Sequence, residues 1–194
     1  MKIQVIAILA VLAVSCVAQE HPTTTTMLRK LGKSGSFNQQ QIDNARDMLQ
    51  ACVGYTTDQR KLAYVLSTAI GESGIRPIKE YRCSPSQSCY QAQERYWYTG
   101  YYGRGYVQLT WQSNYAKFGS LLGVDLVGNP DLALRPDIAG KVICLGMAKG
   151  LFTGVGLDNY FGTGADWYNA RRIVNGLDKA QEFANRAQNI FNQA

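Results

Sequence analysis

The chain has 194 residues, with 20 Lys and Arg against 14 Asp and Glu, a hydrophobic share of 46% and a single histidine, His21. This length allows one full domain or at most two small ones, and the composition is that of a folded protein rather than a disordered one. A single histidine excludes multi-histidine zinc sites. Because this histidine lies near the start of the chain, Ser-His-Asp or Cys-His catalysis would require a catalytic histidine on a flexible chain end. Because glutamate is also rare, acid–base chemistry is expected to use a small set of carboxylates.

The first 18 residues are typical of a secretory leader. Lys2 precedes an apolar run over residues 3–14, and small residues follow up to Ala18. The run is shorter than the roughly 20 apolar residues that span a bilayer, so a cleaved signal peptide is favoured over a membrane anchor. We expect a secreted, extracellular protein with no membrane association after cleavage.

Removal of residues 1–18 would leave four cysteines, an even number that suggests two disulfides in an exported protein. Pairing Cys83 with Cys89 would close a small loop, and pairing Cys52 with Cys144 would join distant helices, but the sequence leaves the other two pairings open. No Cys-x-x-Cys spacing occurs and no histidine is at hand, so no metal site is expected. The net charge of +6 comes from scattered residues, with no basic run that would indicate a nucleic-acid partner.

Residues 19–37 are polar and rich in Thr, Gly and Ser, and they are predicted to form a flexible lead-in. Apolar spacing predicts a helix over residues 38–54 and a second one that begins at Thr56 or Thr57 and ends near Gly74. An irregular stretch rich in Tyr, Ser and Gln follows.

The later part of the chain is also expected to be mainly helical. Residues 106–111 alternate like a short strand, and helical spacing returns over residues 115–122. Pro136 suits the first turn of another helix, and two more helices are expected around residues 165–174 and 180–191. The sequence therefore predicts one mainly α domain with a short strand segment.

Glu72 is the first candidate for a catalytic acid. It continues the apolar stripe of the second helix, three residues after Ala69, so its carboxyl is expected beside apolar side chains. Such a setting makes a carboxyl harder to ionise, which a general acid working near neutral pH needs. The spacing leaves open a helix-end glutamate that turns outward past Gly71.

Glu80 is the candidate for a second carboxylate. Pro77 disfavours a continuous helix, so extended chain could bring Glu80 across from Glu72. Two carboxyls about 6.5–9.5 Å apart leave room for a water between them, as in inverting glycosidases. A surface pair of Lys79 with Glu80 explains the pattern equally well, and Glu94 competes as the second carboxylate.

Aromatic residues crowd beside these glutamates, with ten of the chain's 21 between Tyr81 and Tyr115. Flat rings with polar edges suit sugar rings, although core packing would claim several of them. On the expected strand, the side chains of Tyr106, Gln108 and Thr110 share a face that could line a groove, or they could belong to an ordinary half-buried strand.

The segment at residues 101–111, Tyr-Tyr-Gly-Arg-Gly-Tyr-Val-Gln-Leu-Thr-Trp, resembles a motif of family 19 glycoside hydrolases, Y-[YF]-G-R-G-x-x-Q-[IL]-[ST]-W. This family holds plant-type chitinases and related bacterial and phage wall lysins. Residues 173–176, Ile-Val-Asn-Gly, resemble its later I-[IV]-N-G motif. The similarity covers about residues 38–192 and implies a mainly α, lysozyme-like, two-lobed catalytic domain over residues 38–194.

The resemblance also implies roles for individual residues. Glu72 takes the place of the general acid, and Glu80 takes that of the water-activating base of the compact, loop-poor members. Arg186 resembles the arginine that orients the acid, with Asp178 as its partner. Gly71 departs from the family, because it stands where the family has a histidine beside the acid. The positions that correspond to sugar contacts are Tyr102, Gln108, Thr110, Asn114 and Asn175.

The function implied by the resemblance is a secreted, endo-acting, inverting hydrolase of β-1,4-linked N-acetylglucosamine polymers that needs no metal or cofactor. Its polysaccharide partner is expected to be chitin, with peptidoglycan as the alternative. A carbohydrate-binding protein without turnover is a third possibility, because Gly71 replaces the histidine beside the acid. The chain is expected to be a monomer.

Overall fold

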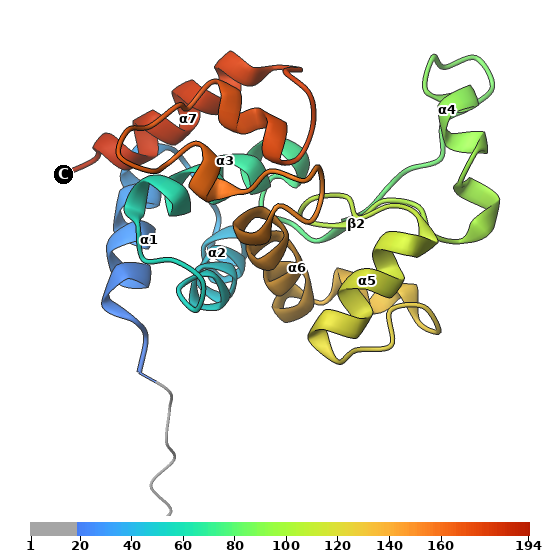
Figure 1. The fold of residues 1–194 in the computed structure, drawn as a ribbon, viewed down its shortest axis with the longest axis horizontal. Coiled ribbons are helices and arrows are strands. Elements are labelled where there is room, and N and C mark those ends of the chain that lie inside the picture. Colours follow the sequence, from blue (N-terminus) through green and yellow to red (C-terminus); the bar gives the residue numbers. More distant parts are fainter. Residues whose placement is uncertain (1–18) are drawn as a thin grey trace, which may run out of the picture.

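The structure, a computed structural model, describes residues 19–194, and the expected leader lies outside them. One lobe is a bundle in which α3 packs against α7 and α2 packs against α6 (Figure 1). Its helices are α1 (Pro22–Ser34), α2 (Gln39–Cys52), α3 (Gln59–Ser73), α6 (Pro136–Lys149) and α7 (Ala180–Asn192). The mainly α, lysozyme-like prediction is confirmed.

The second lobe is built around an antiparallel pair of two-residue strands, in which Ile78 lies opposite Gly105 and Lys79 opposite Arg104. Residues 81–100, here called the arm, carry α4 and η1 and project from the body (Figure 1). Between α6 and α7 lie two short 3-10 helices, η3 (Leu157–Asn159) and η4 (Asn169–Ile173). The remaining elements are β1 (Ile78–Lys79), α4 (Tyr90–Glu94), η1 (Trp97–Thr99), β2 (Arg104–Gly105), α5 (Gln112–Leu122) and η2 (Pro130–Leu134).

The prediction of a flexible lead-in over residues 19–37 is wrong, because α1 is a packed helix. The His21 side chain caps it by accepting a hydrogen bond from the Thr23 amide at 3.1 Å, and Pro22 occupies the first turn. Met27 and Leu31, one turn apart, are fully buried. The polar run of threonines before Met27 gave no helical signal in the sequence, and two apolar residues were too few to reveal the buried face.

Residues 106–111 do not form the expected strand. Arg104 and Leu109 exchange backbone hydrogen bonds of 2.9 and 3.2 Å, which close a tight turn between them. Gln108 and Trp111 have positive φ values of 53° and 75°, which a strand does not contain. Tyr106 is fully buried, so it does not share an exposed face with Gln108 and Thr110 as the alternation predicted.

Two further predictions are adjusted by the structure. The helix expected over residues 165–174 is the five-residue 3-10 helix η4. The N-cap of α3 is Asp58, whose carboxylate accepts from the Arg60 amide, whereas Thr56 accepts from the Asp58 amide.

Of the cysteine pairings that the sequence leaves open, the structure forms the one that joins two helices and closes a small loop. Cys52 of α2 is bonded to Cys144 of α6, with 4.9 Å between the Cα atoms, and Cys83 is bonded to Cys89 in the arm. Within residues 19–194, no helix combines the length and the apolar character needed to cross a membrane.

The burial of α1 generates a stability prediction. Leu31→Ala should lower the free energy of unfolding by about 2–5 kcal/mol, because it removes a fully buried side chain and leaves a cavity. Urea unfolding of the full chain measures this change. Arg29→Ala, at an exposed position of the same helix, is the control and should change it by less than about 0.5 kcal/mol. Equal effects of the two variants would contradict the packed position of α1.

Candidate active site

Glu72 lies in the last turn of α3, and α2 holds the end of this helix in place. Gln41 and Asn44 of α2 donate side-chain hydrogen bonds to the carbonyl oxygens of Gly74 and Ile75, each at 2.9 Å. Gly74 and Ile75 both have positive φ values, 62° and 55°, which end the helix and turn the chain toward β1. The glutamate therefore stands on a rigid part of the larger lobe.

The carboxylate of Glu72 is paired with a buried cation, in place of the apolar surroundings that its position on the helix predicted. Its Oε1 accepts a hydrogen bond of 2.7 Å from Nη1 of Arg171, whose side chain is 4% exposed. Arg171 belongs to η4, donates through Nε to the carbonyl oxygen of Asp178, and lies 4.0 Å from the centre of the Phe183 ring. These contacts fix the guanidinium, and with it one oxygen of Glu72.

The structure gives Arg186 and Asp178 other contacts than those expected. Arg186 bonds to Glu182 and to the carbonyl oxygen of Ser67, and Asp178 supplies a backbone carbonyl to Arg171. The residue that contacts Glu72 is Arg171, which sequence reasoning missed. The only available signal was a basic residue four positions before Asn175, at the edge of the Ile-Val-Asn-Gly motif.

Gly71 and Phe183 occupy space in a complementary way. A Cβ atom at Gly71 would overlap the Phe183 ring and come within 2.9 Å of Nη1 of Arg186. Phe183 is 3% exposed, and its ring lies close to the guanidinium groups of both Arg171 and Arg186. A ring from α7 therefore fills the space beside Glu72 that a larger residue at position 71 would need.

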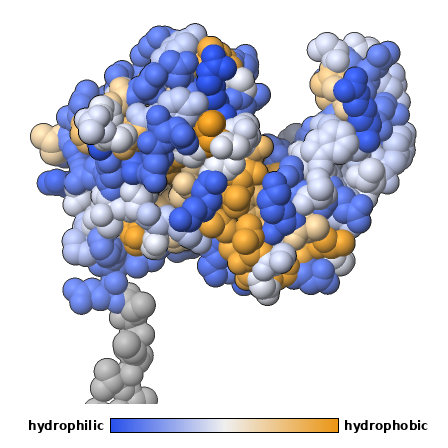
Figure 2. Space-filling view, in the orientation of Figure 1, coloured by the Kyte–Doolittle hydropathy of each residue, from blue (hydrophilic) through white to orange (hydrophobic). Residues whose placement is uncertain are grey.

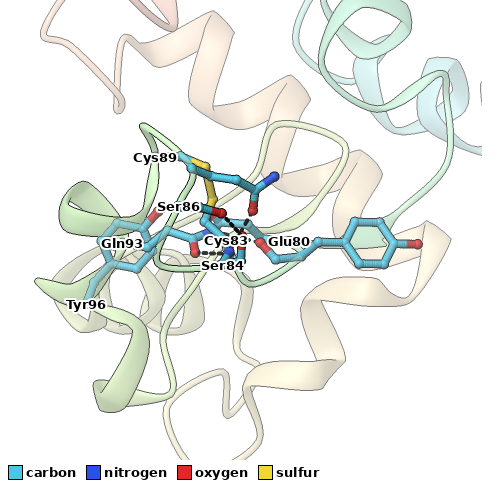
Figure 3. Close-up of a disulfide and its surroundings, with 9 residues drawn as sticks. Glu80, Cys83, Ser84, Ser86, Cys89, Gln93 and Tyr96 are labelled. Atoms are coloured by element: carbon cyan, nitrogen blue, oxygen red, sulfur yellow. Dashed lines mark hydrogen bonds between the residues drawn. A yellow bond between two sulfur atoms is a disulfide. The ribbon is translucent and has the colours of Figure 1, made fainter.

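Glu80 directly follows β1 and accepts three hydrogen bonds. Its Oε1 accepts from Nε2 of Gln93 at 2.8 Å and from the hydroxyl of Tyr96 at 2.7 Å, and its Oε2 accepts from the amide of Gly103 at 2.8 Å. Figure 3 shows Glu80, Gln93 and Tyr96 together beside the Cys83–Cys89 disulfide. A carboxylate offers about four acceptor positions, so the remaining one is on Oε2.

Gly103 permits the close approach of Glu80 and Gln108. A Cβ atom at this position would lie 3.1 Å from Oε2 of Glu80 and 2.8 Å from Oε1 of Gln108. The backbone amide of Glu80 also donates to the carbonyl oxygen of Gly103 at 2.8 Å, so the two residues are joined in both directions. Gly103 of the 101–111 motif therefore contacts Glu80 directly.

Three of the expected sugar-contacting residues, Gln108, Thr110 and Asn114, line one small cavity of about 150 Å³ with Trp111 and others. The Gln108 amide donates to the carbonyl oxygens of Ile78 and Gly105, which leaves its oxygen as the free group. Thr110 and Asn114 each donate one bond to a backbone carbonyl oxygen of the turn. The positive φ values of Gln108 and Trp111 place unusual backbone at this cavity, a common property of binding sites.

Tyr102 and Asn175, also expected to contact sugar, lie in different surroundings. The Tyr102 ring stacks on Trp97 at 4.4 Å and has the guanidinium of Arg104 4.0 Å from its centre. Asn175 is exposed, and its backbone amide donates to the carbonyl oxygen of Arg171, so it lies beside the residue that holds Glu72.

The competing carboxylate, Glu94, is paired with Arg82 inside the arm at 2.5 Å. Within the described chain, residues 19–194, no group of three or more His, Cys, Asp or Glu side chains is close enough to hold a metal ion.

The mainly helical, two-lobed fold is that of a lysozyme-like glycoside hydrolase. The family described as chitinase class I, glycoside hydrolase family 19, matches residues 16–145, which is more than half of the chain. The chain therefore belongs to family 19.

Individual relatives agree with this placement. An endochitinase of Arabidopsis thaliana is 35% identical over 111 residues, 54% of this chain and 38% of its own length. The inactive chitinase-like protein 1 of Hevea brasiliensis is 41% identical over 56 residues, 29% of this chain and 14% of its own. The chain thus spans well under half the length of these curated relatives. The solved structure of chitinase C from Streptomyces griseus HUT6037 is 25% identical, with a TM-score of 0.55 over 88% of each chain.

The fit between Gly71 and Phe183 generates a second prediction. Gly71→Ala should lower the free energy of unfolding by about 1–3 kcal/mol, because the new methyl group overpacks against a buried ring. Urea unfolding at neutral pH measures the change. Gly32→Ala is the matched control, because Gly32 is also helical but has open space around it, and it should stabilise by about 0.4–1 kcal/mol. Stabilisation by both substitutions would show that Phe183 moves aside freely.

Proposed function

We propose that the chain is a secreted chitinase, an endo-acting hydrolase of β-1,4 bonds between N-acetylglucosamine units. The observation that carries the proposal is the contrast between its two glutamates. Glu72 is paired with a buried arginine, whereas Glu80 is held by three hydrogen-bond donors and keeps one acceptor position open. Inverting glycoside hydrolysis uses two carboxyl groups, one that protonates the leaving oxygen and one that activates a water.

Glu72 is the proposed general acid. Arg171 occupies Oε1, so the other oxygen can carry the proton that is passed to the leaving glycosidic oxygen. When the proton leaves, the carboxylate that forms is stabilised by the adjacent guanidinium, at the moment when the transition state develops.

Glu80 is the proposed general base in an inverting reaction. Because its three partners all donate, the carboxylate acts as an acceptor, and the open position on Oε2 can take a proton from the attacking water. Its neighbour Gln108 lines the small cavity together with Thr110 and Asn114, and amide and hydroxyl side chains of this kind suit the hydroxyl and acetamido groups of a sugar.

Exposed aromatic rings support a polysaccharide as the substrate. Tyr81 and Tyr98 of the arm are 87% and 73% exposed, and Trp111 is 45% exposed beside the cavity. Figure 2 shows the arm standing away from the body, with an open hollow between them. Rings of this kind can lie against the apolar faces of sugar units in a long chain.

A secreted location agrees with two disulfides and with the leader-like first 18 residues. The proposed catalytic domain includes α1 and thus begins before residue 38, and it acts as a monomer. The second candidate function, carbohydrate binding without turnover, is favoured by Gly71 at the family's histidine position and by a relative named as inactive.

Both glutamates are expected to be essential for turnover. Glu72→Gln and Glu80→Gln should each lower kcat by about 100-fold or more with the fold intact, since general acid and base catalysis each contribute about 10²–10⁴-fold. The measurement is hydrolysis of soluble N-acetylglucosamine oligomers, with circular dichroism as the check on folding.

Two matched variants and a second substrate complete this experiment. Glu182→Gln, on the surface of α7, should keep full activity, and Glu94→Gln should keep most of it; a selective loss in Glu94→Gln would assign the base to Glu94. Faster clearing of bacterial walls than release from colloidal chitin would replace chitin by peptidoglycan. Sugar binding by the unaltered chain without any hydrolysis would favour the non-catalytic candidate.

The stereochemistry of the product tests the water-activating role of Glu80. Attack by water from the face opposite the leaving group should give the α-anomer first from a β-linked oligomer. Proton NMR spectra recorded in the first minutes, before mutarotation, measure this ratio. An initial β-anomer would mean a retaining reaction and would overturn the proposed role of Glu80.

A further inference from the structure

Gln93 of α4 is a buried amide whose hydrogen-bonding groups are all used. Its side chain is 3% exposed. Nε2 donates to Oε1 of Glu80 and to the carbonyl oxygen of Tyr81, both at 2.8 Å, and Oε1 accepts from the amide of Cys83 at 2.7 Å. A flipped amide would set its oxygen against two acceptors and its NH₂ against a donor, so these surroundings permit one orientation only. That orientation aims an N–H group at Glu80.

Both cysteines of the Cys83–Cys89 disulfide make a backbone hydrogen bond with Gln93. The backbone amide of Cys83 binds the side chain of Gln93, and the carbonyl oxygen of Cys89 accepts from the backbone amide of Gln93 at 3.0 Å. The two cysteines are six residues apart, and their Cα atoms are 6.0 Å apart (Figure 3). A helix as short as α4, with five residues, has little stability of its own. The disulfide therefore helps to keep the hydrogen bonds of Cys83 and Cys89 with Gln93 in place.

Tyr96 supplies the second donor from the arm. Its ring packs edge-on against Trp111 with 5.3 Å between centroids, and its hydroxyl donates to the same oxygen of Glu80. Burial, together with this hydrogen bond, raises the pKa of Tyr96 above that of a free phenol, which is already protonated at neutral pH. Trp111 lines the cavity with Gln108 and Asn114, so the arm meets the cavity wall at this pair of rings.

We propose that Gln93 and Tyr96 are positioning residues for the general base, and that the Cys83–Cys89 disulfide keeps them in place. Together they hold Oε1 of Glu80, so that the open acceptor position of Oε2 faces the attacking water. The arm is then part of the catalytic machinery as well as a surface for the polymer. This inference rests on the proposed function, because it assigns a role to residues that act through Glu80.

The test compares kcat and KM on the soluble hexamer of N-acetylglucosamine. Gln93→Leu, Tyr96→Phe and the double variant Cys83→Ser/Cys89→Ser should each lower kcat by about 10- to 100-fold, because small displacements of a catalytic group have effects of this size. KM should stay within about twofold, since none of these side chains is assigned a sugar contact. Gln91→Leu, at an exposed position of the same short helix, is the matched control and should change neither constant.

A double-variant cycle separates positioning from general stability. In a Glu80→Ala background, Gln93→Leu should cause no further loss of the residual rate, because the group through which it acts is gone. A further loss there, a rise in KM with unchanged kcat, or full activity of Gln93→Leu and Tyr96→Phe would each overturn the inference while leaving the proposed function intact. A lack of hydrolysis by the unaltered chain would overturn both.

Discussion

The buried guanidinium of Arg104 connects the parts of the smaller lobe on which the site depends. It donates to the carbonyl oxygens of Gly100 and Tyr102, to the hydroxyl of Tyr115, and to Asp131 at 2.7 Å, while its side chain is only 4% exposed. These partners belong to the end of the arm, the segment before β2, helix α5 and η2. Burial raises the pKa of Tyr115 to about 12, and its hydroxyl donates to the carbonyl oxygen of Tyr102. A buried charge is tolerated only with partners of this quality, which is why this arginine can organise so many backbone groups.

Much of the larger lobe could be predicted because its signals are local. The start of α2 at Asn38, the end of α3 at Gly74, and Pro136 in the first turn of α6 are each found in the structure. The even number of cysteines predicted two disulfides, and the structure contains two, but their pairing could not be read from the sequence. Helices of the larger lobe were therefore predictable where their start and end signals agreed with the apolar face that packs in the core.

Other features depend on contacts that no short pattern contains. Helix α1 is stabilised by burying Met27 and Leu31 in the core, which outweighs its poor run of β-branched threonines. The turn after Arg104 follows from two backbone bonds to Leu109 and from a positive φ at Gln108, where alternation alone favoured a strand. Arg171 rather than Arg186 contacts Glu72, while Arg186 is bonded to Glu182 and to the carbonyl oxygen of Ser67, and no local sequence pattern distinguishes these two arginines.

The two glutamates stand on supports of unequal rigidity. Glu72 is carried by a long helix whose end is held from α2, whereas two of the three donors to Glu80 come from the projecting arm. The arm has few partners in the body, so its orientation depends on a row of stacked groups at its root. In this row the guanidinium of Arg104 lies over Tyr102, Tyr102 stacks on Trp97, and Trp97 lies below Arg82, with separations of 4.0, 4.4 and 5.3 Å. Because segments with few buried contacts open most easily, the geometry of the base should be more sensitive to temperature and denaturant than that of the acid. Activity would then be lost before the helical lobe unfolds, with the arm as the element that fails first.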